Sequence, residues 1–249
     1  MAQLDNRYAQ SPTAVRAGVA VDEGLRAYML GVYNYMAAGV ALTGVAAYLT
    51  NQLAGGSLET LTPLGQALYL SPLKYVIAFA PLAFVLIASF RMQSMTVAGA
   101  QLMFWTFAAI MGVSISWIFL AFAGQSIVQV FFITAASFGA LSLWGYTTKR
   151  DISGWGSFLF MGLVGIIIAA LVNLFLQSGG LQFAISVIGV LVFAGLTAYD
   201  TQRIKDGYLM IRHDATMVAK GAIMGALNLY LDFINMFIML LNLFGSSRD

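Results

Sequence analysis

Two aspartates lie where an apolar helix would not be expected to carry charge. Asp232 is near the middle of the apolar segment 220–244, and Asp200 ends the apolar segment 181–200. A charged aspartate at the centre of a membrane helix costs about 2.5–3.5 kcal/mol, so we expect Asp232 to face the protein interior or a hydrated cavity. Two carboxyl groups on adjacent helices titrate together rather than independently. Such a pair can hold a proton near neutral pH and exchange it for a cation.

The neighbours of Asp232 also predict an inward-facing polar stripe. Asn228, Asp232, Asn235 and Asn242 are spaced by 4, 3 and 7 residues, which places them on one face of a helix. Calcium prefers about six to eight oxygen ligands, so two aspartates alone would form an incomplete cage. Water, backbone carbonyls and the amides of Asn228 and Asn235 would complete a weak transit site. The alternative is a structural role, in which a neutral aspartate forms hydrogen bonds between helices.

The composition identifies the elements that must position these residues. Of the 249 residues, 60% are hydrophobic and 9% are charged, whereas a soluble domain carries about 25% charged residues. No charge occurs between Arg91 and Lys149 or between Asp151 and Asp200, and each gap accommodates two spans of about 20 residues. This pattern excludes a soluble enzyme and a nucleic-acid-binding protein. We predict a polytopic protein of the lipid bilayer.

Seven apolar segments predict an all-α membrane protein, a seven-transmembrane-helix bundle in one domain over 27–244. Helices are required because the bilayer core cannot satisfy open strand edges. We expect a polar cytoplasmic tail over 1–26, a charge-rich cytoplasmic loop over 201–219 and a short tail over 245–249. The predicted helices are 27–50, 74–91, 98–120, 126–146, 156–177, 181–200 and 220–244.

Basic residues predict how the bundle is oriented. With seven spans, ten of the twelve Lys and Arg residues lie on the side of the N-terminus, and only Lys74 and Arg248 lie on the other side. The positive-inside rule therefore predicts a cytoplasmic N-terminus and an external C-terminus. A six-span arrangement with a re-entrant last segment is the alternative. The absence of cysteine and of a cleavable signal peptide favours a bacterial inner membrane.

Two C-terminal motifs resemble the paired signature of the Bax inhibitor motif family. They are residues 199–204, Tyr-Asp-Thr-Gln-Arg-Ile, and residues 229–235, Leu-Tyr-Leu-Asp-Phe-Ile-Asn. The resemblance covers about 27–244 and implies a seven-helix bundle around a central last helix. It also implies a pH-sensitive calcium leak, in which two aspartates sense protons and an arginine ending the second helix latches the first aspartate.

The resemblance assigns roles to particular positions of this chain. By motif, the proton- and calcium-sensing pair is Asp200 and Asp232, and the latch is Arg91, which is matched by its position at the end of an apolar helix. We expect Tyr199, Asn228 and Asn235 to line the site. Calcium would be a permeant or transiently bound ion, and we expect no tightly bound cofactor.

Three functions compete at this point. The first is a calcium leak gated by protonation of the aspartate pair. The second is a regulatory protein without transport, because the resemblance also implies cytoprotection and control of membrane proteases; residues 201–219 would then dock a membrane protease or another membrane protein. The third is an intramembrane aspartyl protease, which we reject because residues 229–232 read Leu-Tyr-Leu-Asp where that class has Gly-x-Gly-Asp. We therefore expect no enzymatic activity.

Overall fold

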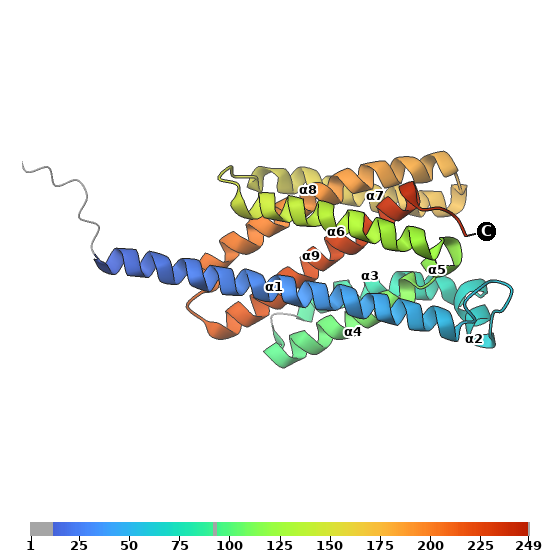
Figure 1. The fold of residues 1–249 in the computed structure, drawn as a ribbon, viewed down its shortest axis with the longest axis horizontal. Coiled ribbons are helices and arrows are strands. Elements are labelled where there is room, and N and C mark those ends of the chain that lie inside the picture. Colours follow the sequence, from blue (N-terminus) through green and yellow to red (C-terminus); the bar gives the residue numbers. More distant parts are fainter. Residues whose placement is uncertain (1–11, 92–93, 249) are drawn as a thin grey trace, which may run out of the picture.

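The computed structural model describes residues 12–91 and 94–248, with side chains for 23–87, 90–91 and 94–248. In this part of the chain the only strand-like pairing is an isolated bridge between Phe122 and Ser247, so the predicted all-α fold is confirmed. Figure 1 shows the arrangement of the helices. Their order is α1 (Pro12–Leu53), α2 (Pro63–Gly65), the π-helix η1 (Gln66–Leu70), α3 (Leu73–Arg91), α4 (Val97–Ile115), α5 (Ile118–Ala121), α6 (Gly124–Thr147), the 3-10 helix η3 (Ser153–Trp155), α7 (Gly156–Leu176), α8 (Gly179–Ile211) and α9 (Ala215–Phe244).

Six of the described helices or helix pairs are long and apolar enough to cross a membrane. They cover Glu23–Leu53, Val97–Ala121, Gly124–Thr147, Ser153–Leu176, Gly179–Ile211 and Ala215–Phe244. A seventh span results if Pro63–Leu70 and Leu73–Ile87, which meet at a bend of 67°, are counted together. The bend falls at Ser71, which adopts an extended conformation because the residue before a proline disfavours helical geometry.

Two boundaries differ from the sequence prediction. Helix α1 begins at Pro12, so helical structure includes residues 12–26, which we predicted as a tail. The predicted loop 201–219 is wrong: α8 continues to Ile211 and α9 starts at Ala215, leaving only 212–214 as a connection. The polar residues that follow the apolar segment do not end α8, because its C-terminal part packs against another helix. Here Tyr208 is buried against Tyr28 of α1, with ring centroids 5.0 Å apart.

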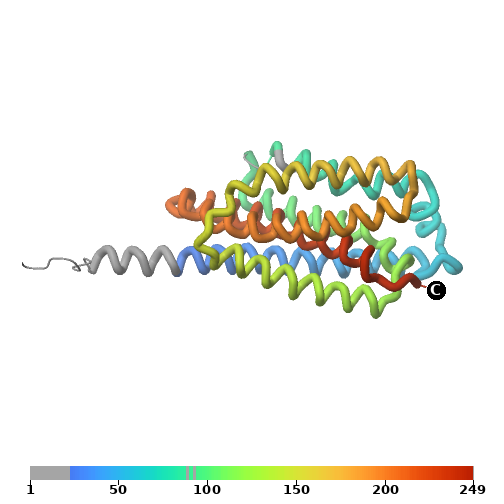
Figure 2. The backbone as a smooth tube through the Cα atoms, turned by 90° about the horizontal axis from the view of Figure 1, so that it is seen from above, coloured from blue at the N-terminus to red at the C-terminus, as the bar shows by residue number. Residues whose placement is uncertain are grey.

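Helix α9 lies at the centre of the bundle. It packs against α8, α1, α6 and α4, and the views in Figures 1 and 2 both show it enclosed by other helices. Leu229 and Tyr230 are fully buried. By contrast, α7 is peripheral and packs mainly on α8, so most of its side chains are exposed. The predicted central last helix is confirmed.

Residues near the C-terminus form hydrogen bonds at the end of the bundle where α1 ends and α6 begins. The Arg248 guanidinium donates to the carbonyls of Gly56 and Phe119, at 3.0 and 2.8 Å. Its backbone N–H donates to the Ala121 carbonyl at 3.0 Å, and the Ser246 N–H donates to the Ser126 hydroxyl at 2.9 Å. Residues 245–248 therefore connect the α1–α2 loop, α5 and α6.

Glycines of α6 show where the helices approach closely. Gly145 is buried where a β-carbon would collide with the Ala198 carbonyl of α8. Six residues earlier, Gly139 has no atom within 4 Å of the position where its β-carbon would be. Small residues allow the backbones of membrane helices to come together. Gly145 therefore sets the α6–α8 distance, whereas Gly139 borders open space.

We expect the two substitutions to alanine to change stability in opposite directions. Gly145→Ala should destabilise the protein by about 1–3 kcal/mol because the methyl group overpacks the α6–α8 contact. Gly139→Ala should be neutral or stabilise the protein by up to about 1 kcal/mol, because alanine favours helix without a clash. Equilibrium unfolding of both variants in the same detergent measures the difference. Equal stabilities would show that α6 and α8 are not in backbone contact at Gly145.

Candidate functional site

Asp232 is buried in the central helix, with 4% of its surface exposed. Its Oδ2 atom has no hydrogen-bond partner, a condition shared in the described part of the chain only by Asn51 Nδ2 among fully buried side-chain polar atoms. Buried polar atoms in folded proteins are almost always hydrogen-bonded. Asp232 therefore has an oxygen in the protein interior that is available to a proton or a cation.

The structure brings Asp200 to Asp232. Helices α8 and α9 pack along their lengths, and the two carboxyl groups are close enough to interact electrostatically. Asp200 is half-buried, and the charge of Arg203, three residues further along α8, also acts on it. The pair is thus asymmetric: one member is enclosed, and the other is near a cation at the polar end of α8.

The predicted lining residues lie in different surroundings. Asn228 and Asn235 are half-buried on α9, on the face that their spacing shares with Asp232. The Asn235 side-chain amide donates to the Leu231 carbonyl of its own helix at 2.8 Å. Tyr199 lies toward α7, since a β-carbon at Gly156 would lie 2.5 Å from its hydroxyl. The structure therefore does not bring the Tyr199 hydroxyl to the aspartate pair.

Arg91 is exposed at the end of α3 and forms no ion pair with Asp200. Helix α3 packs on α4 and η1, whereas α8 packs on α9, α6 and α7. The basic side chain whose charge acts on Asp200 is Arg203, for which the sequence predicted no role at the site. The arginine latch is not formed in this conformation and stays a prediction.

Tyr230 and Thr43 hold the segment of α9 that carries Asp232. The Tyr230 hydroxyl is 2.6 Å from Thr43 Oγ1. Thr43 also lies 2.9 Å from the carbonyls of Gly39 and Ala108. Because the single Thr43 hydrogen is directed to a carbonyl, Tyr230 is the donor to Thr43. This buried contact connects α9 to α1 and α4, two residues from Asp232.

Gln202 and Lys205 hold the segment of α8 that follows Asp200. The Gln202 side chain accepts from the Ile152 N–H and donates to the Arg150 carbonyl, both at 2.9 Å. The Lys205 ammonium donates to the Tyr146 carbonyl at 3.0 Å. The sequence motif contains Gln202, but nothing in its spacing reveals a partner some fifty residues away. These contacts fix α8 against the α6–α7 connection.

The side-chain atoms that could ligate a metal ion at the site suit transient rather than tight cation binding. Within residues 23–87, 90–91 and 94–248, no group of three or more acidic, histidine or cysteine side chains is placed to hold a metal ion. Two carboxylates and the nearby amides supply only oxygen atoms from side chains, which suit a hard cation such as calcium. The arrangement can bind a proton at one carboxyl group or share a cation between two.

Comparison with known proteins gives a consistent assignment. A family model described as inhibitor of apoptosis-promoting Bax1 matches residues 25–249. A protein of Caulobacter vibrioides is 45% identical over 250 residues, covering 100% of both chains. The inner membrane protein YbhL of Escherichia coli is 44% identical over 227 residues, covering 90% of this chain and 94% of its own. This relative and the apolar helices confirm the predicted location in a bacterial inner membrane.

Proposed function

Since the chain belongs to the Bax inhibitor family, we propose that it is a pH-sensitive calcium leak whose proton and cation site is the pair Asp200 and Asp232. The observation that carries the proposal is the buried Asp232 oxygen without a hydrogen-bond partner, near a second carboxyl group on the adjacent helix. The role is ion passage rather than catalysis.

The physical argument starts from the cost of burying charge. A carboxylate enclosed in protein at membrane depth is costly unless a proton or a cation compensates it. Two such groups near each other compete for both, because each added charge changes the affinity of the other. Protonation would neutralise the pair, and calcium would neutralise it differently by pulling both carboxylates toward one ion. The packing of α8 against α9 then depends on which occupant is present.

The proposal includes the orientation of the bundle. We place the N-terminus in the cytoplasm and count the bent pair of α2–η1 and α3 as one span, giving seven. Support comes from the basic residues, because Arg26, Arg150 and Arg203 would then lie on the cytoplasmic side. Asp200, at the polar end of α8, would be reached from the cytoplasm, while Asp232 would lie deeper in the membrane.

A second candidate is the regulatory role without transport. The observation that favours it is the polar end of α8 and its turn, where Arg203, Asp206, Arg212 and His213 are exposed. Such a charged, helical projection is a suitable surface for docking a membrane protease or another membrane protein. If purified protein carries no calcium across a membrane, this candidate replaces the leak.

The test is calcium flux into proteoliposomes that contain the purified full-length protein, measured over a series of internal and external pH values. Wild-type protein should carry calcium above the level of empty vesicles, at a rate that changes with pH. The double variant Asp200→Asn, Asp232→Asn should retain no pH dependence, because asparagine does not titrate. A double variant with the wild-type pH profile would contradict the aspartate pair as the sensor.

Asp151→Asn is the matched control for this experiment. Asp151 lies outside the membrane-spanning helices, between α6 and η3. The Ser153 backbone N–H donates to its Oδ1 at 2.9 Å and lowers the pKa of this exposed carboxyl group, so Asp151 stays ionised across the neutral range. Asparagine can accept the same hydrogen bond through its side-chain oxygen. The control should therefore reproduce the wild-type pH profile.

A further inference from the structure

A groove separates α1 from α6 along the surface of the bundle. The two helices run side by side in opposite directions in both views, with α9 behind the groove in Figure 1. Two cavities lie along it, each lined by residues from both helices, with volumes of about 370 and 300 Å³. We call this feature the α1–α6 groove. It is lined by Arg26 and Tyr146 at one end and by Ala47 and Ile127 toward the other.

The first cavity has a basic side chain, Arg26, at its mouth and apolar walls below. Arg26 lines it at the polar end of α1; its side chain is exposed and makes no hydrogen bond or ion pair with any described residue. Leu30 and Leu143 form exposed apolar walls, and Gly139 leaves open space where a side chain would otherwise project. A positive charge above an apolar slot is complementary to a molecule with an anionic head and a hydrocarbon chain.

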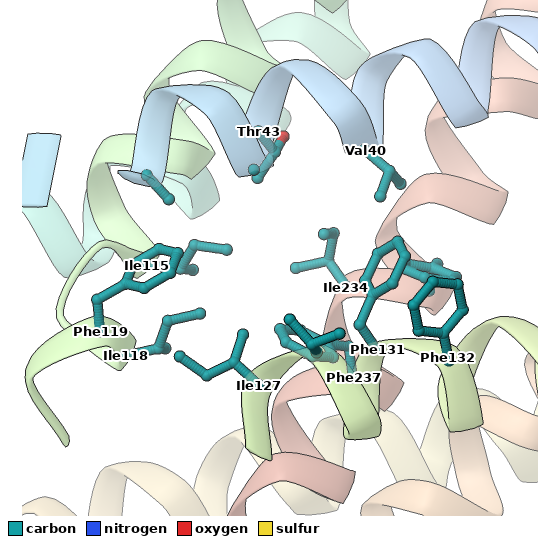
Figure 3. A pocket seen from close by; sticks show the side chains of 14 residues that line it. Val40, Thr43, Ile115, Ile118, Phe119, Ile127, Phe131, Phe132, Ile234 and Phe237 are labelled. Carbon is teal, nitrogen blue, oxygen red and sulfur yellow. The ribbon is translucent and has the colours of Figure 1, made fainter. Parts of the chain in front are cut away.

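The second cavity continues the groove with apolar residues. Figure 3 shows side chains from α1, α4, α5, α6 and α9 around it, including Val40, Phe131 and Phe132. The Thr43 hydroxyl is directed to its buried partners and offers no free donor. From Arg26 to Val40 a helix rises about 20 Å, somewhat more than the roughly 15 Å of one leaflet of hydrocarbon. An acyl chain of leaflet length that starts at Arg26 would therefore fill the first cavity and end short of Val40.

The floor of the first cavity is connected to the helix of Asp200. The Tyr33 hydroxyl lies 2.7 Å from the Ser142 hydroxyl, which in turn lies 2.9 Å from the Thr201 hydroxyl. Tyr33 and Ser142 both line the cavity, and Ser142 and Thr201 are buried. An occupant of the groove therefore touches the first member of a hydroxyl chain that joins α1, α6 and α8 next to Asp200.

We propose that the α1–α6 groove binds an anionic phospholipid of the cytoplasmic leaflet, with the phosphate at Arg26 and one acyl chain between Leu30 and Leu143. The leaflet rests on the proposed orientation of the bundle, but lipid binding does not depend on calcium transport. The phospholipid fills the space beside Gly139 and restrains α1 against α6. It thereby stabilises the hydroxyl chain to Thr201.

Native mass spectrometry of the full-length protein in detergent tests this site, with phosphatidylglycerol and phosphatidylcholine of identical acyl chains as probes. Wild-type protein should retain phosphatidylglycerol with at least about fivefold preference, because one interfacial arginine contributes roughly that factor toward an anionic lipid. Arg26→Gln should bring the two lipids to equal binding. Gly139→Leu should reduce binding of both, since its side chain would project into the slot from a position where a β-carbon meets no neighbouring atom.

Two matched controls separate this site from general effects of charge and bulk. Arg212→Gln removes an exposed basic residue elsewhere at the polar end of the bundle and should keep the preference for phosphatidylglycerol. Gly165→Leu adds the same bulk on α7, where a β-carbon also meets no atom within 4 Å, and should keep binding of both lipids. An unchanged lipid preference in Arg26→Gln, or unchanged binding in Gly139→Leu, would overturn the proposal. Neither result bears on calcium flux, which is measured separately.

Discussion

Asp232→Asn is expected to abolish most of the pH dependence of calcium flux on its own. Asp232 is enclosed at 4% exposure with one oxygen unpartnered, so its charged form is costly without a proton or cation. The cost of about 2.5–3.5 kcal/mol corresponds to roughly a hundredfold change in population, which is large enough to control the arrangement of the helices. Asparagine fixes the neutral state. Flux in this variant should change less than about twofold over a pH range in which wild-type flux changes about tenfold.

The companion variant Asp200→Asn should have a smaller effect on the pH profile. Asp200 is half-buried, and the charge of Arg203 acts on it, so its ionised form is better compensated than that of Asp232. The measurement is again flux in proteoliposomes, with unfolding of each variant followed in detergent to confirm a folded protein. If Asp200→Asn removed the pH dependence while Asp232→Asn left it intact, the deep aspartate would be structural and the present mechanism would be wrong.

Tyr230→Ala should produce the largest loss of stability among the residues near the site. The ring is fully buried and meets Phe104 and Phe107 edge to face, with centroids 6.0 and 5.7 Å away. Removing a large buried aromatic ring leaves a cavity and costs about 3–5 kcal/mol. The hydroxyl contact to Thr43 is lost as well. Equilibrium unfolding in mild detergent measures the change.

Tyr230→Phe separates the hydrogen bond from the volume of the ring. It keeps the aromatic contacts and removes only the hydroxyl, so it should cost about 1 kcal/mol, a typical value for a hydrogen bond between membrane helices. Thr43→Val removes the same hydrogen bond from the α1 side and should cost more, because it also removes the contacts of Thr43 with two carbonyls and leaves the buried Tyr230 hydroxyl without a partner. If Tyr230→Ala and Tyr230→Phe had the same stability, the aromatic ring would not be what holds α9 in place.

The sequence already identified most of the architecture because the bilayer imposes strict rules. Each of the seven predicted segments overlaps one of the long helices of the structure, since hydrocarbon accepts only segments that satisfy their own backbone. These rules do not apply outside the membrane, and the helix boundaries predicted there were wrong. The charges of residues 201–211 suggested a loop, but Gln202, Lys205 and Tyr208 have partners in other segments of the chain and keep α8 helical.

The sequence by itself determined that this is a helical membrane protein of the Bax inhibitor family with two aspartates in late helices. Residue types, their spacing and the length of apolar runs are local properties. Because the bilayer accepts only long apolar helices, these properties are enough to predict the membrane spans. Only the tertiary structure decided that Asp200 and Asp232 are neighbours, that Arg203 rather than Arg91 acts on Asp200, and that Tyr230 is held by Thr43. These facts depend on how each helix is rotated and offset against the next, which is set by side-chain packing across distant segments.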